Sequence, residues 1–253
     1  MESQLTTPKI SPFDERRDLV VPGDYEATIR FAAAHILTIA HASIEKTGFF
    51  AVAFSGGQTP QAIFRELSLR ENQKKTDWNK WLCFWSDERN VPSSDPESNY
   101  GMAMRAGLGE LPLTRSHIFP METDGSLDQN ATSYEALIRT RTPLGKLDLV
   151  MLGLGEDGHT ASLFPRTLGL HAKNSWVIPN YIPQKHSWRL TLTFDCIQSA
   201  GLASLYVMGK QKADIVAKVL KGTYDPDNLP AQRVGTSSHK SLWILDREAS
   251  AQL

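Results

Sequence analysis

The 253-residue sequence contains only two cysteines, Cys83 and Cys196. Two thiols that lie far apart in the chain, each among apolar residues, can build neither a disulfide framework nor a zinc site, so both are expected to be buried and reduced. The sequence also has almost no net charge, −1 at pH 7. No overall electrostatic field recruits nucleic acid or an anionic membrane, and an anionic small molecule would need a local group of basic residues.

Long apolar segments are scarce as well. The N-terminal sequence MESQLTTPKISPFDERRDLVV has no apolar core flanked by basic residues, so it lacks the pattern of a signal peptide. No stretch is expected to reach the length of a transmembrane helix. We therefore expect a cytoplasmic protein that binds neither nucleic acid nor a membrane, and the residues give no indication of its oligomeric state.

Residues 147–165 carry the strongest functional pattern. The apolar run Leu147–Leu152 has the length of a buried strand, and it ends in Gly153–His159, where three glycines and two acids surround one histidine. Glycines let the backbone take positive φ values and approach a ligand closely. Ligands of open α/β sheets bind outside the carboxyl ends of the strands. His159 is therefore predicted to transfer protons, because an unperturbed imidazole has a pKa of about 6.5. The alternative is a turn in which His159 bonds only its own loop.

A second predicted strand, residues 49–54, runs into a glycine-rich loop. The loop consists of Ser55, Gly56, Gly57, Gln58 and Thr59 and leads into a helix, with Thr59 as the expected N-cap and Pro60 in the first turn. Where a strand leads through a glycine loop into a helix, the unpaired N–H groups of the first helical turn point toward one position. An anion can bind at that position. The loop has neither the GK[ST] of a Walker loop nor the dinucleotide spacing. The alternative is that the glycines serve only to let the loop pack tightly and bind no phosphate.

A third predicted strand, Trp81–Trp85, ends in the polar run Ser86-Asp87-Glu88-Arg89. The planar guanidinium of Arg89 suits an anionic oxygen. Further along, Lys210 and Lys212 lie near a predicted helix start, where the helix dipole disfavours positive charge. Their position is explained if they face an anion. A solvated pair of lysines is the alternative.

The order of the predicted elements determines the fold class. Strands alternate with helices of ordinary length, which predicts an α/β fold with a mostly parallel, Rossmann-like sheet and helices on both faces, in one domain over residues 1–253. The three polar strand ends then share one edge of the sheet. The other expected elements are an extended arm over 1–22, helices over 24–45, 99–108 and 128–140, strands over 117–120, 176–178, 189–193, 205–208 and 241–246, and a loop over 180–187.

Together these motifs resemble the 6-phosphogluconolactonase family. They occur in the family's order and span nearly the whole chain: SGGQTP at 55–60, SDERNVPSSDPESNYGMA at 86–103, GLGEDGHTASLFP at 153–165, RLTLT at 189–193, GKQKA at 209–213 and LWILDREA at 242–249. The resemblance implies a fold shared with glucosamine-6-phosphate deaminases and ribose-5-phosphate isomerases. It also implies a reaction that needs no metal or organic cofactor.

The resemblance further implies hydrolysis of 6-phospho-D-glucono-1,5-lactone to 6-phospho-D-gluconate in the oxidative pentose phosphate pathway. The phosphate of this small-molecule partner would contact the N–H groups of residues 55–59, with Arg189 and Lys212 as charged partners at the family's positions. Neutral His159 would take a proton from the attacking water, and Arg89 would stabilise the oxyanion, with amides of the glycine-rich turn as further donors. Asp87 or Asp157 would orient His159 or hold a sugar hydroxyl, and the sequence leaves open which does which.

Two other functions fit parts of the sequence. A sugar-phosphate isomerase or deaminase of the same fold keeps the DGH turn, but the deaminase family continues with residues resembling IAFNEP where this chain has TASLFP. A non-catalytic sugar-phosphate sensor would carry an appended DNA-binding segment and could lack the histidine. The absence of a covalent-hydrolase G-x-S-x-G elbow argues against a serine nucleophile.

Overall fold

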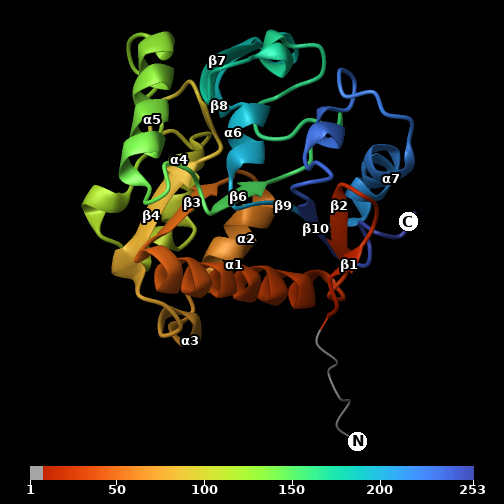
Figure 1. The fold of residues 1–253 in the computed structure, drawn as a ribbon, viewed down its shortest axis with the longest axis horizontal. Coiled ribbons are helices and arrows are strands. Elements are labelled where there is room, and N and C mark those ends of the chain that lie inside the picture. The colour runs from red at the N-terminus through yellow and green to blue at the C-terminus, as the bar shows by residue number, and fades with distance from the viewer. Residues whose placement is uncertain (1–7) are drawn as a thin grey trace, which may run out of the picture.

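The computed structural model describes residues 8–253, and a seven-stranded sheet forms its centre (Figure 1). The strands lie in the order β1-β2-β10-β9-β6-β3-β4, and every neighbouring pair is parallel except β1 with β2. Their bounds are β1 Ser11–Pro12, β2 Arg17–Val20, β3 Phe50–Phe54, β4 Trp81–Trp85, β6 Leu149–Leu152, β9 Leu202–Val207 and β10 Ser241–Leu245. The predicted α/β fold with a mostly parallel sheet is confirmed. The part of the predicted N-terminal arm that precedes residue 8 lies outside the described residues.

The two faces of the sheet belong to two separate hydrophobic cores. In β3, Phe50, Val52 and Phe54 pack into one core, and Ala51 and Ala53 into the other, as the two-residue period of a strand requires. Helices lie on both faces in Figure 1. The core with the β3 aromatics contains α1 (Tyr25–Thr47), α2 (Gln58–Leu67) and α4 (Asn99–Arg105), and the other contains α5 (Leu127–Arg141), α6 (Phe194–Ser199) and α7 (Ala213–Lys221).

The helix α1 has bounds close to those predicted. The Asp24 carboxylate accepts a hydrogen bond from Ala27 N at 2.9 Å at its start, and Gly48, with φ of 87°, ends it. By length and composition alone α1 could cross a membrane, with a mean hydropathy of 1.2 over 18 residues, so the expectation that no segment reaches this length was wrong. One face of α1 packs on the sheet, as the core helix of a globular fold does.

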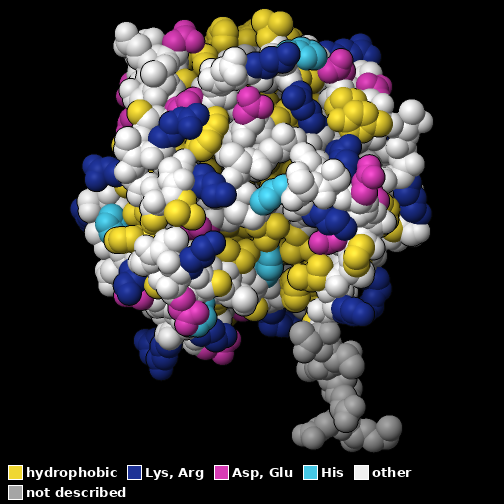
Figure 2. Space-filling model, in the orientation of Figure 1, with side chains coloured by type: hydrophobic (Ala, Val, Ile, Leu, Met, Phe, Trp, Pro, Cys, Tyr) yellow, Lys and Arg dark blue, Asp and Glu magenta, His cyan; other side chains and the backbone are white. Residues whose placement is uncertain are grey.

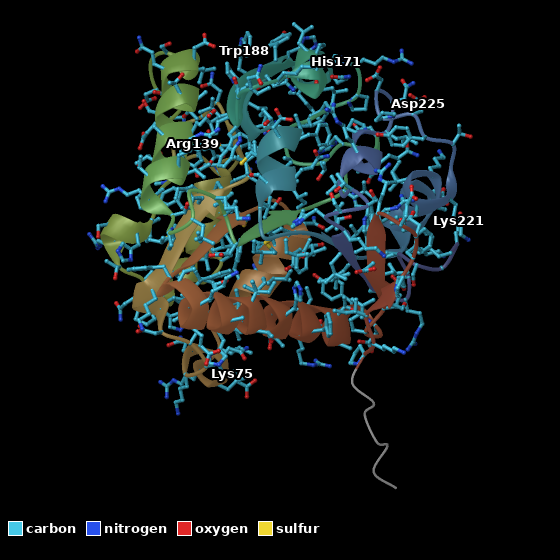
Figure 3. All side chains as sticks on the ribbon, viewed as in Figure 1. Lys75, Arg139, His171, Trp188, Lys221 and Asp225 are labelled. Carbon is cyan, nitrogen blue, oxygen red and sulfur yellow. The ribbon has the colours of Figure 1, made fainter. Side chains whose placement is uncertain are left out.

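A second, antiparallel sheet was not predicted. It has three strands in the order β5-β8-β7, with bounds Asp87–Arg89, Ser187–Leu192 and Val177–Ile182. Ser86 joins the two sheets, because its N–H donates to Phe54 O at 2.7 Å and its carbonyl accepts from Leu192 N at 2.8 Å. The chain therefore passes from β4 straight into the second sheet. The β7–β8 hairpin lies at the top of Figure 1, and Trp188, labelled above it in Figure 3, is 45% exposed.

Two predicted elements differ from the structure. The expected loop over 180–187 supplies the end of β7, a 3-10 turn over Pro183–Lys185 and the first residue of β8. The expected strand over 117–120 is wrong. Phe119 N donates to Cys83 O, and Ile118 forms a single isolated bridge beside β4. Pro120, which follows, has no N–H to continue a ladder.

Tyr134 of α5 ties the end of β4 to the neighbouring backbone. Its hydroxyl accepts from Trp85 N at 2.7 Å and donates to Phe119 O at 2.9 Å, and the side chain is buried. Tyr134→Phe should therefore lower the free energy of unfolding by about 2 kcal/mol, because it leaves two backbone groups unsatisfied in the core. Urea denaturation measures this difference. Tyr181→Phe, at a position that is 41% exposed, is the control and should change stability by less than about 0.5 kcal/mol. Equal midpoints for the two variants would contradict this role.

Candidate active site

The carboxyl ends of β6, β3 and β4 lie side by side, because β3 pairs in parallel with both of its neighbours. A cavity of about 240 Å³ opens at this edge. The structure therefore brings the predicted strand ends together. Predicted residues that line the cavity are Ser55, Gly56, Gly57, Asp87, Arg89, His159 and Lys212.

A larger recess of about 540 Å³ adjoins this cavity. The two share Gly56, Gly57 and Lys212 in their walls, and the larger one extends along Gln58 and Thr59 at the start of α2. The site consequently has two compartments, one beside His159 and one beside the first turn of a helix.

His159 is held by the carboxylate of Asp157. The two side chains approach to 2.5 Å between His159 Nδ1 and Asp157 Oδ1, and the His159 N–H donates to the same oxygen at 3.1 Å. The imidazole ring stacks on Phe164 with 3.8 Å between the ring centroids. An ionised carboxylate can only accept hydrogen bonds, so Nδ1 carries a proton, and in the neutral imidazole Nε2 is the nitrogen with the free lone pair. The side chain of His159 is 27% exposed and lines the cavity.

The electrostatics of Asp157 favour its charged form. Partial burial acts to raise its pKa, but the hydrogen bonds and the charge of His159 outweigh burial and lower the pKa overall. The loop around the pair is closed by Gly155 N, which donates to His159 O at 2.8 Å. A Cβ at Gly155 would lie 2.0 Å from His159 Nδ1, so only glycine fits there.

The sequence of this loop, Gly153–Gly158, matches the dinucleotide-binding pattern G-x-G-x-x-G. In the structure, however, the loop leads into a turn and not into a helix, so the context that a dinucleotide site requires is missing.

The glycine-rich loop starts α2 earlier than predicted. Gly57 is the N-cap, with φ of 100°, and the helix begins at Gln58. Thr59 therefore lies within the first turn, and its prediction as the N-cap was wrong: a positive φ at the cap position suits glycine and not threonine. The N–H groups of Gln58 and Thr59 belong to the first turn, which has no acceptors within its own helix. They border the larger recess.

Asn99 is a site residue that the sequence did not single out. A Cβ at Gly56 would lie only 1.8 Å from Asn99 Oδ1, and Asn99 Nδ2 donates to Asp87 O at 2.9 Å. Asn99 thus packs the glycine-rich loop against β5. Asn99 is buried in the first turn of α4, whose N-cap is Ser98. The sequence carries no signal for the residues that Asn99 contacts.

Glu88 faces away from the cavity. Its carboxylate accepts hydrogen bonds from the N–H groups of Arg89, Asn99 and Tyr100 at 2.7–2.8 Å and from Ser98 Oγ at 3.1 Å. Burial raises the pKa of Glu88, and these backbone hydrogen bonds offset only part of the effect. Glu88 therefore binds the start of α4 to β5 and is not available for substrate.

Arg89 and Arg189 face each other across the β5–β8 pair. Like charges directly opposite each other destabilise a sheet unless an anion lies between or beside them. Arg89 donates to Glu97 O and lies 3.9 Å from its carboxylate. Burial, and then the charge of Arg89, lower the pKa of Arg189. Among residues 8–253, neither arginine has a partner for its buried Nε. Arg189 lines neither compartment, so only Arg89 of this pair borders the cavity directly.

Lys212 borders both compartments. Its ammonium group donates to Leu154 O at 2.8 Å. Burial lowers the pKa of Lys212, although Glu156 and Asp157 act in the opposite direction. Lys210 lines neither compartment. Of the two lysines at this helix start, only Lys212 faces the predicted anion site.

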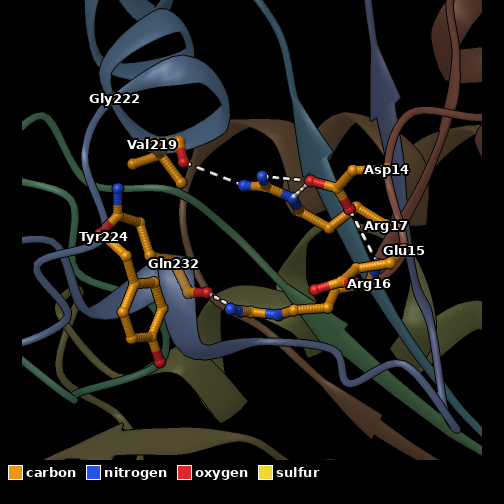
Figure 4. A pocket seen from close by; sticks show the side chains of 8 residues that line it. All are labelled: Asp14, Glu15, Arg16, Arg17, Val219, Gly222, Tyr224 and Gln232. Carbon is orange, nitrogen blue, oxygen red and sulfur yellow. Dashed lines mark hydrogen bonds and ion pairs between the residues drawn. The ribbon is translucent and has the colours of Figure 1, made fainter.

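Another recess, of about 460 Å³, lies beside β2 and α7 and shares no lining residue with the two compartments (Figure 4). Arg17 donates there to Val219 O at 2.9 Å and Leu220 O at 3.0 Å, at the end of α7, and Arg16 donates to Gln232 O. Both guanidinium groups donate hydrogen bonds to backbone carbonyls. This recess therefore offers little to an anionic ligand, despite its two arginines.

Charges on the surface are mixed. On the face seen in Figure 2, Lys and Arg side chains are interspersed with Asp and Glu, and neither sign forms one large patch. Within residues 8–253, no group of three or more His, Cys, Asp or Glu side chains is arranged to hold a metal ion. The basic groups that border the strand-end cavity are therefore a local feature.

Comparison with known proteins identifies the family. Residues 23–243 match the family model of glucosamine-6-phosphate isomerases/6-phosphogluconolactonase. The chain belongs to this family. The 6-phosphogluconolactonase of Chlamydia pneumoniae is 35% identical over 238 residues, which cover 94% of this chain and 91% of that protein. That of Chlamydia trachomatis is 38% identical over 240 residues, covering 95% and 91%.

Solved structures agree with this assignment. The 6-phosphogluconolactonase from Trypanosoma cruzi matches with a TM-score of 0.80 at 25% identity, over 96% of this chain and 98% of that one. A monomeric glucosamine-6-phosphate deaminase matches with a TM-score of 0.79 at 21% identity, over 93% and 99%, which establishes a common fold. The predicted family, the fold shared with the deaminases and the enzyme class, a lactone hydrolase of the 6-phosphogluconolactonase type, are confirmed.

The contact between Gly56 and Asn99 can be tested directly. Gly56→Ala should lower the free energy of unfolding by about 1–3 kcal/mol, because its Cβ forces Asn99 away from the loop. Urea denaturation measures the change. Gly153→Ala is the matched control, since it lines the same cavity and an added Cβ there meets nothing within 4 Å. If both variants unfold at the same midpoint, Asn99 does not pack the loop as described.

Proposed function

We propose that the chain hydrolyses 6-phospho-D-glucono-1,5-lactone to 6-phospho-D-gluconate with His159 as the general base and without a cofactor. One observation carries the proposal: His159, paired with Asp157 through Nδ1 at 2.5 Å, lines a cavity that continues into the anion-binding start of α2. Relatives with 35% and 38% identity that bear the name 6-phosphogluconolactonase support the choice of substrate.

The phosphate of the substrate binds in the larger compartment. The first-turn N–H groups of Gln58 and Thr59 and the ammonium of Lys212 supply hydrogen bonds and positive charge. Arg189, the cross-strand partner of Arg89, lines neither compartment and is therefore not a direct phosphate contact in this arrangement. Binding the phosphate there positions the lactone carbonyl in the smaller compartment, beside His159, and this orientation is itself part of the catalysis.

The chemical step uses the free Nε2 of His159. Water attacks the lactone carbonyl carbon while Nε2 takes its proton, and Asp157 stabilises the resulting imidazolium. The tetrahedral intermediate then collapses: the bond between the carbonyl carbon and the ring oxygen breaks, and the imidazolium returns the proton to that oxygen. The product is a carboxylic acid with a free hydroxyl, and the acid loses its proton to solvent.

The remaining polar groups have separate tasks. Arg89, at the rim of the cavity, stabilises the oxyanion that forms as water adds to the carbonyl. Asp87 lines the cavity but has no hydrogen bond to His159, whose partner is Asp157. We therefore assign Asp157 to orienting the base and Asp87 to accepting a hydrogen bond from a sugar hydroxyl.

Replacement of the base tests the chemical step. His159→Gln should lower kcat roughly 10²–10⁴-fold, the usual contribution of a general base, and leave binding of 6-phosphogluconate within about threefold. Turnover is measured by proton release and binding by calorimetry. His41→Gln is the control, because His41 is an exposed residue of α1. A His159→Gln variant with wild-type kcat would remove His159 from the mechanism.

Replacement of Lys212 tests the phosphate compartment. Lys212→Met should raise KM at least tenfold with a smaller effect on kcat, since a hydrogen bond to a charged group contributes roughly 1.5–3 kcal/mol. Lys210→Met is the matched control in the same turn and should leave KM unchanged. Unaltered KM in Lys212→Met would place the phosphate elsewhere.

The same residue predicts a pH dependence of binding. Because the pKa of Lys212 is lowered, its charge is lost at a lower pH than that of a free lysine, and affinity for 6-phosphogluconate should fall as pH rises through this value. Calorimetry between neutral and alkaline pH measures the decline. It should be absent in Lys212→Met. A decline of the same size in both proteins would assign the dependence to another group.

A further inference from the structure

Ser162 lies next to the cavity-lining residue Ala161 and is hydrogen-bonded to the β5–β8 strand pair. It is 1% exposed and does not itself line the cavity. Its hydroxyl donates to Asp87 Oδ2 at 2.7 Å, and its N–H donates to Thr191 Oγ1 at 3.1 Å. Thr191 is the cross-strand partner of Asp87, so Ser162 bonds both members of one pair in the β5–β8 ladder.

The position of Ser162 is fixed from other directions too. Its carbonyl accepts from Asn180 Nδ2 at 2.9 Å, and the same amide group donates to Thr167 Oγ1 at 3.0 Å. Asn180, Thr167 and Thr191 are all buried. Because the backbone of Ser162 is held on both sides in a buried network, its hydroxyl donates to the Asp87 carboxylate from a fixed position.

We infer that Ser162 is a positioning residue that acts through Asp87. By donating to Oδ2, it leaves Oδ1 as the oxygen of Asp87 that is free to accept a hydrogen bond from a hydroxyl of the phosphosugar lactone. Oδ1 accepts a long hydrogen bond from Ser86 Oγ at 3.4 Å, and a carboxylate oxygen has a lone pair left for a second donor. This inference rests on the proposed function, because it deepens the role given there to Asp87.

The arrangement also links the three strand ends to one another. The main chain of Asp87 is bonded to Asn99, which packs on Gly56 after β3, and its side chain is bonded to Ser162, three residues beyond His159 after β6. Asp87 itself follows β4. A change at Ser162 should therefore reach substrate through Asp87 and not through His159, whose own partner is Asp157.

A pair of isosteric variants tests the hydroxyl alone. Ser162→Thr keeps the donor and Ser162→Val replaces it with a methyl group of nearly the same volume, so any strain from the added branch is common to both. We expect Ser162→Val to lower kcat/KM roughly tenfold relative to Ser162→Thr, the usual effect of losing a hydrogen bond to a charged group. Ser199→Ala, whose hydroxyl bonds Cys196 O on α6, is a control that should match the wild type.

A double-mutant cycle distinguishes positioning from a structural role. In an Asp87→Ala background, exchanging Thr for Val at position 162 should change kcat/KM by less than twofold, because the acceptor through which the hydroxyl acts is gone. Circular dichroism and thermal unfolding confirm that each protein is folded. The inference is overturned if the Thr-to-Val ratio is the same in both backgrounds, or if the two variants are equally active with Asp87 present.

Failure of the proposed lactonase activity can be distinguished from failure of the inference about Ser162. A wild-type protein without lactonase activity would refute that proposal. The same cycle is then run on the affinity for 6-phosphogluconate, measured by calorimetry. Coupling between positions 87 and 162 in that affinity supports the inference, and additive changes overturn it.

Discussion

The parallel pairing of β3 with both β4 and β6 is the constraint on which the site depends. It brings the carboxyl ends of three strands to one edge, and each strand end adds a different chemical group. The end of β3 supplies the start of a helix, that of β4 supplies Asp87 and Arg89, and that of β6 supplies the loop with His159. A slip of register in either pair would separate His159 from the start of α2, so the proposed catalytic geometry depends on the sheet.

The second constraint is electrostatic. The chain has a net charge of −1, yet Arg89 and Lys212 border the strand-end cavity and Arg189 pairs with Arg89 across β5 and β8. These groups are partly buried, and burial lowers the pKa of both Arg189 and Lys212. A dianionic ligand would compensate these cations when it binds. In the proposed function this ligand is the phosphate of the substrate, which the partly buried cations would bind.

Sequence reasoning reached the parallel sheet and its polar edge because both follow from local patterns. The apolar run before His159 and the run before Ser55 each have strand length, and polar residues follow both. The same reasoning missed the antiparallel sheet, since β5 has only three residues and its pairing with β8 joins segments about a hundred residues apart. It also missed Asn99 and Ser162, whose importance comes from what they contact. The assignment of Asp157 as the partner of His159 needed the loop conformation, which letters alone do not contain.

The measurement that tests the central claim most directly compares two lactones. Fresh 6-phosphoglucono-1,5-lactone and unphosphorylated glucono-1,5-lactone are each added to pure protein treated with a chelator, and proton release is followed against the spontaneous rate. A base at one strand end and an anion site at the next predict strong acceleration with the phosphorylated lactone and little with the other. Equal rates for the two lactones, or no acceleration of either by folded protein, would contradict the account.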